Sequence, residues 1–120
     1  MSILFGTADK VSNEKATERL GSFLIEGEEI LLSFKTYRDF YALTNKRLLS
    51  LDVQGMTGSK KEVRSVSWGK VSGFSIEGAG TFDSDAELKL WVSGMPMIEV
   101  KLDRSTPIED IQRVIAERTL

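Results

Sequence analysis

The stretches AELKLWV (residues 86–92) and IEVKLD (residues 98–103) alternate apolar with polar side chains almost without a break. Successive side chains of a β-strand point to opposite faces of the sheet, so this period of two predicts two half-buried antiparallel strands. The same period recurs in five earlier runs, at residues 30–35, 40–43, 48–53, 61–68 and 74–76. Seven short strands joined by turns predict an antiparallel barrel or sandwich.

Both ends of the chain change to a helical period. Residues 9–24 place apolar side chains on one helix face, which predicts a helix packed on the domain. The segment TPIE at residues 106–109 predicts a capping box, with Pro107 at the first helical position. The apolar stripe that follows comprises Ile108, Ile111, Val114 and Ile115. We therefore expect an N-terminal helical extension at residues 1–27, and a domain at residues 28–120 whose barrel the last helix closes.

Composition excludes several classes of function. Cys and His are both 0, which removes thiol nucleophiles, Cys/His zinc sites, His-ligated haem and the usual general base near neutral pH. Sixteen Lys and Arg against 18 Asp and Glu give a formal charge of -2, so no general basic field favours nucleic acid. We predict a non-enzymatic protein without a cofactor or metal. The first residues are too short an apolar run for a signal peptide, and we predict a cytoplasmic location.

Three segments carry a resemblance to a known family. They are RDFYALTNKRL (38–48), QGMTGSK (54–60) and FDSDAELKLWVSG (82–94). Together they resemble the bacterial pleckstrin-homology (PH) domain family, over nearly the whole chain from Phe34 onward. The resemblance implies a mainly β fold with α: a PH-like seven-stranded antiparallel barrel or sandwich, capped by a C-terminal α-helix and preceded by a helical extension. It also implies assembly into homo-oligomeric rings, and it carries no established catalytic activity.

Within these motifs, several residues have ordinary structural interpretations. Asn45 tolerates the left-handed conformation of a tight hairpin turn, and Gly55 and Gly58 can supply positive φ in the next one. Asp83 and Asp85 can accept backbone hydrogen bonds ahead of a strand. The run DSDAE at residues 83–87 lacks the glycine of a calcium loop, which argues against a calcium site.

Apolar residues at strand positions that are expected to face outward predict a contact surface. The outward side chains are Leu31, Tyr41, Leu48 and Trp91 if the alternate residues of their strands point inward, among them Ile30, Leu32, Phe34, Leu49, Leu51 and Val53. Such residues either form subunit contacts or lie under the N-terminal helix. The leading hypothesis is a self-associating interaction module whose partners are further copies of itself and an unidentified protein.

Two alternative functions remain open. A local basic patch could bind anionic membrane lipid or another phosphate ligand, although charged residues of this kind also form ordinary solvated rims. The candidate residues are Lys35, Arg38, Lys46, Arg47, Lys60 and Lys61. A peptide could also add as a strand between an open sheet edge and the C-terminal helix.

Overall fold

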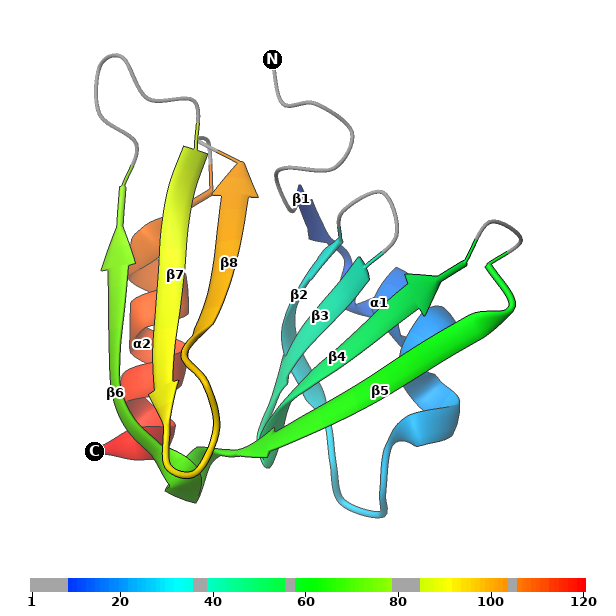
Figure 1. Ribbon diagram of the computed structural model, residues 1–120, viewed down its shortest axis with the longest axis horizontal. Helices are drawn as coiled ribbons and strands as arrows, with labels where there is room; N and C mark the ends of the chain where they lie inside the picture. Colours follow the sequence, from blue (N-terminus) through cyan, green and yellow to red (C-terminus); the bar gives the residue numbers. More distant parts are fainter. Residues whose placement is uncertain (1–8, 36–38, 56–57, 79–84, 104–105) are drawn as a thin grey trace.

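Two antiparallel sheets converge at one end of the molecule and spread apart at the other (Figure 1). The computed structural model describes residues 9–35, 39–55, 58–78, 85–103 and 106–120. The first sheet has the order β1-β2-β3-β4-β5 and the second has the order β6-β7-β8. The strands are β1 Asp9–Val11, β2 Ile30–Lys35, β3 Asp39–Thr44, β4 Arg47–Gln54, β5 Lys60–Ser67, β6 Val71–Glu77, β7 Asp85–Val92 and β8 Ile98–Asp103. The helices are α1 Asn13–Leu20 and α2 Ile108–Thr119, with short 3-10 turns η1 Gly21–Phe23 and η2 Trp68–Lys70.

The seven predicted strands correspond to β2 through β8, so the period-two interpretation is confirmed. The expected closed barrel is wrong: among the described residues, the hydrogen-bonded ladders form two separate sheets. The chain leaves the first sheet at β5, turns through η2 and enters the second sheet at β6 (Figure 1). This turn interrupts the pairing that would close a barrel.

The N-terminal helix is shorter than predicted. Asp9–Val11 forms an extra strand that pairs with the edge of β2, with Val11 opposite Ser33. Ser12 then caps α1, because its hydroxyl accepts a hydrogen bond of 3.1 Å from the amide of Lys15. The extension is therefore built into the first sheet.

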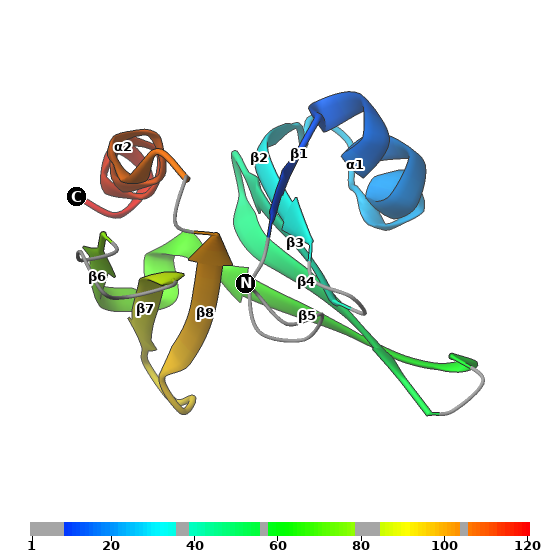
Figure 2. The same cartoon turned by 90° about the horizontal axis from the view of Figure 1, so that it is seen from above.

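The first sheet is buried on both faces along strands β2 to β4. Its inner face packs against the second sheet and α2 through a main core that includes Phe34, Leu43 and Leu48. Its outer face carries a second core, made of Phe40, Ala42, Leu49 and Leu51 beneath Ala16 and Leu20 of α1 (Figure 2). Placing Leu48 outward was wrong, because Leu49 faces α1 and Leu48 faces the main core at 3% exposure. A strand buried on both faces gives no sign of which parity is inward.

The predicted capping box at the start of α2 is also wrong. The helix begins at Ile108, and Pro107 is its N-cap, with no hydrogen bond from a side chain. Thr106 is buried and its amide donates to the carbonyl of Asp103 at 2.9 Å. The expected apolar stripe is confirmed by the buried Ile111 and Ile115.

Candidate interaction surface

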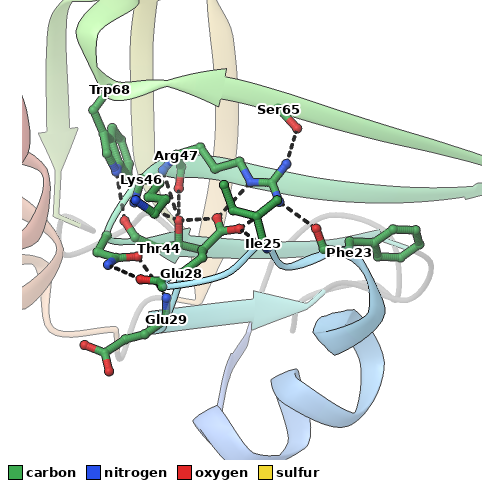
Figure 3. A network of polar contacts seen from close by, with 11 residues as sticks. Phe23, Ile25, Glu28, Glu29, Thr44, Lys46, Arg47, Ser65 and Trp68 are labelled. Carbon is green, nitrogen blue, oxygen red and sulfur yellow. Dashed lines mark hydrogen bonds and ion pairs between the residues drawn. The ribbon is translucent and has the colours of Figure 1, made fainter.

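A buried carboxylate organises the TNKR segment (residues 44–47) at the corner between the sheets (Figure 3). The Nε of Arg47 donates to Glu28 Oε2 at 2.8 Å, and its Nη2 donates to Oε1 at the same distance. The hydroxyl of Thr44 donates to Oε2 at 2.7 Å, and the amide of Ile25 donates to Oε1 at 3.1 Å. These bonds, with that of Arg47 first, lower the pKa of Glu28 to about 2 although burial opposes them. Glu28 is therefore a carboxylate held in place by four donors.

Arg47 also ties this corner to the rest of the sheet. Its Nη1 donates to the hydroxyl of Ser65 at 2.7 Å, and its Nη2 donates to the carbonyl of Phe23 at 2.7 Å. The indole of Trp68 donates to the carbonyl of Thr44 at 2.8 Å. The network joins the segment after α1, the β3–β4 turn, β5 and η2 (Figure 3). Its role is to hold these elements together.

Asn45 also stabilises this corner, but through its side chain and not through the backbone conformation that its sequence context predicts. No non-glycine residue in the described part of the chain has positive φ, so the left-handed conformation expected for Asn45 is wrong. Its side chain accepts from the amide of Glu29 at 2.8 Å and donates to the carbonyl of Gly27 at 2.9 Å. The positive φ expected at Gly55 and Gly58 is confirmed, at 81° and 73°.

The candidate anion-binding residues do not come together. Lys46 and Arg47 lie at the start of β4, whereas Lys60 pairs with Gln54 at the other end of that strand. Eight residues of strand put these ends roughly 20 Å apart. Arg47 is already engaged by Glu28, and Arg38 lies outside the described residues. Lys35, at the end of β2, lies at the same end of the first sheet as Lys60 and Lys61.

That sheet end also holds an acidic pair that sequence reasoning missed. Asp39 and Asp52 lie directly opposite each other in the β3–β4 register. Burial raises the pKa of Asp39 to about 6, with further contributions from the hydrogen bond and charge of Asp52. Burial and the two carboxylates raise the pKa of Tyr41 to about 12. The pair holds a proton more tightly than an isolated aspartate, and its negative charge opposes anion binding nearby.

We expect this pair to make stability depend on pH. The pKa of Asp39 is about 6 when folded against 3.8 as its ordinary value, so the folded state binds the extra proton between these limits. Its contribution is favourable at low pH and is lost as pH rises through about 6. Asp39→Asn should raise the free energy of unfolding at pH 7 by about 1 kcal/mol, a value reduced for solvent screening. Urea titrations of both proteins from pH 4 to about pH 7 check this. If the two free energies of unfolding differed by the same amount at every pH in that range, the prediction would be contradicted.

Three large apolar side chains stand exposed at the β7–β8 hairpin. Trp91 is 44% exposed, Met95 38% and Met97 42%. Gly94 makes the turn at φ 80°, and the amide of Met95 donates to the carbonyl of Val92 at 3.2 Å. We call Trp91, Met95 and Met97 the hairpin patch. It lies outside the main core, because the neighbours of Trp91 along β7 are the ones that point inward.

Of the four predicted contact residues, Trp91 alone lies well exposed. Leu31 is half-buried, and Tyr41 is half-buried against the main core. Leu48 belongs to that core. Charged residues share the face of β7 that carries Trp91, with Glu87 opposite Lys101 and Lys89 opposite Glu99.

An open strand edge forms a second exposed feature. In the described part of the chain, β5 pairs with β4 on one side and has no strand on the other. All of its residues except Val66 are exposed, and Val63 is 40% exposed. The β4–β5 hairpin projects away from the rest of the molecule (Figure 2). Such an edge can add a strand or another chain segment.

Within the described ranges, no three His, Cys, Asp or Glu residues are grouped so as to hold a metal ion. Residues 83 and 84 of the DSDAE run lie outside those ranges. No described helix has the length and apolar character needed to cross a membrane.

Two antiparallel sheets, joined at a corner and packed against a C-terminal helix, define a pleckstrin-homology-like fold. The sequence matches the Bacterial PH domain family over residues 1–119. The chain belongs to this family, as the three sequence segments imply.

Relatives support the assignment along the whole chain. The uncharacterized protein YjqA of Bacillus subtilis is 42% identical over 115 residues, which cover 94% of this chain and 92% of the relative. The crystal structure of a DUF1696 family protein with a pleckstrin-homology domain from Shewanella loihica has a TM-score of 0.84 at 39% identity, covering 96% and 99% of the two chains. The crystal structure of a pleckstrin homology domain from Shewanella amazonensis has a TM-score of 0.71 at 40% identity, and the match covers 96% of this chain and 94% of that chain.

Proposed function

We propose that this chain is a non-enzymatic, PH-like interaction module that assembles with copies of itself into a ring in the cytoplasm. The hairpin patch is the observation that carries the proposal. Trp and Met are enriched in protein interfaces, and a Trp often dominates the binding energy. Here a Trp and two Met lie exposed on one hairpin.

The site chemistry supports a binding role over a catalytic one. The sequence has no His or Cys, and the Glu28 carboxylate and the Arg47 guanidinium bind each other within the fold. We therefore assign the corner network to stability and the exposed apolar surface to binding.

A ring requires two different surfaces on each copy, because a surface that contacts itself closes a dimer. We propose that the hairpin patch of one copy meets the open edge of β5 on the next. Val63 supplies an exposed apolar side chain at that edge. The unpaired backbone groups of β5 would gain hydrogen-bond partners in such a contact.

Light scattering during size exclusion tests the assembly. The expected result is a single species whose mass is a multiple of the 13.4 kDa chain. Negative-stain images should then show a closed ring. A mass of one chain at micromolar concentration would contradict the proposal.

Anion binding remains the second candidate, for a specific reason. Lys60 and Lys61 are both exposed on the projecting β4–β5 hairpin. A lipid role predicts sedimentation with vesicles that contain phosphatidylserine, weakening with salt and with the double substitution Lys60→Glu/Lys61→Glu. If the amount of protein that sediments did not depend on the phosphatidylserine content of the vesicles, anion binding would be excluded as a candidate function.

A further inference from the structure

The two methionines of the hairpin patch expose their side chains on either side of Pro96. Met95 is 38% exposed and Met97 is 42% exposed. Because the sequence contains no Cys, its sulfur is carried entirely by methionine thioethers. An exposed thioether is open to oxidation in a way that a buried one is not.

We propose that Met95 and Met97 are an oxidation site, and that their conversion to methionine sulfoxide releases the assembly. This inference rests on the proposed function, since it concerns the surface assigned to subunit contact. It adds a form of regulation, in which a peroxide or a comparable two-electron oxidant controls the assembly.

The oxidation step is balanced with hydrogen peroxide. The sulfur lone pair attacks one peroxide oxygen, an S–O bond forms and the O–O bond breaks. The sulfur loses two electrons, which reduce the other peroxide oxygen, and that oxygen leaves as water after proton transfer. Methionine sulfoxide reductases reverse the change with electrons from thiols.

The sulfoxide oxygen changes the chemistry of the patch. It is a strong hydrogen-bond acceptor on a side chain that was apolar. The patch also contains the exposed Trp91, and Ile98 follows Met97 as a buried core residue. Burying the sulfoxide in a contact without a donor carries a desolvation cost, and two such groups add to it.

Exchange between protomers and the assembly gives the oxidant access. A contact through the hairpin patch would shield both thioethers, whereas a free protomer exposes them. Oxidation therefore acts on the free protomer and prevents its return. The assembled state should be oxidised more slowly at high protein concentration.

The experiment treats the native chain and the double variant Met95→Leu/Met97→Leu with hydrogen peroxide. Leucine keeps a similar apolar volume and cannot form a sulfoxide. Peptide mass mapping measures oxidation at each methionine, and light scattering measures assembly. We expect the dissociation constant of the native chain to rise at least about tenfold once both residues are oxidised. The dissociation constant of the variant, whatever its value before treatment, should not change on treatment, and a methionine sulfoxide reductase should restore the native assembly.

Three outcomes would overturn the inference. An assembly that persists with both residues fully oxidised would show that the sulfoxides do not disrupt the contact. Equal dissociation of the leucine variant would place the effect elsewhere in the chain. A native chain that is already monomeric before treatment would overturn the proposed function together with this inference, and the untreated sample separates that case from the other two.

Discussion

Replacement of Arg47 by alanine is expected to lower the free energy of unfolding by about 3–5 kcal/mol at pH 7. The side chain of Glu28 is fully buried, and Arg47 supplies two of its four donors. Removing the guanidinium leaves an uncompensated buried carboxylate. The substitution also removes the bonds from Arg47 to Ser65 and to the carbonyl of Phe23.

The pH dependence provides a second signature of the same contact. The pKa of Glu28 is about 2 when folded against 4.5 as its ordinary value, so its favourable contribution is present above about pH 4.5. That contribution is lost as pH falls through about 2. In Arg47→Ala the carboxyl can take up a proton at a higher pH, so the difference between the two proteins should shrink as the solution is acidified.

Urea unfolding of four proteins measures this effect. Lys46→Ala is the matched control, since Lys46 is exposed and should change stability by less than about 0.5 kcal/mol. The double variant Glu28→Gln/Arg47→Met should lose less free energy of unfolding than Arg47→Ala, because no buried charge remains at the site. A loss below about 1 kcal/mol for Arg47→Ala would show that the corner network does not hold the fold together.

Trp91→Glu is expected to raise the dissociation constant of the assembly at least about thirtyfold, as for a central interface residue. A carboxylate at this position would lie among apolar side chains in the contact. Val63→Glu should have a comparable effect from the other side of the interface. Each variant alone should sediment mainly as a monomer.

Mixing the two variants tests the geometry of the contact. Each retains one intact surface, so the intact β5 edge of Trp91→Glu can meet the intact hairpin patch of Val63→Glu. We expect the mixture to form a heterodimer that neither variant forms alone. Leu120→Glu is the control, because Leu120 is 98% exposed at the chain end. Normal assembly of Val63→Glu would instead place the partner surface elsewhere.

Hydrophobic period was sufficient to predict most of the fold. The alternation at residues 86–92 and 98–103 identified β7 and β8, and the helical stripe around Ile111 identified α2. The same period misplaced Leu48, because α1 covers the outer face of a sheet whose inner face is also buried. The pattern identifies a strand, but it cannot show which face meets the main core.

The site was less predictable, because its contacts join distant residues. Glu28 and Arg47 are 19 positions apart, and neither local spacing nor charge indicated their pairing. The six basic residues were grouped by type, although the β4–β5 register separates them. Met95 and Met97 lie around a turn, where no period exists to identify them. Their nearness to Trp91 and Gly94 in the sequence was the available signal.

Quenching of tryptophan fluorescence by acrylamide, followed as the native protein is diluted, tests most directly whether the hairpin patch is the subunit contact. The chain has two tryptophans: Trp68 is 4% exposed within a protomer and Trp91 is 44% exposed. Trp68 should resist quenching at every concentration, so any change reports on Trp91. We predict that quenching is weak in the concentrated assembly and increases on dilution. Strong quenching that does not vary with concentration, in a sample that light scattering shows to be assembled, would contradict the role of the patch.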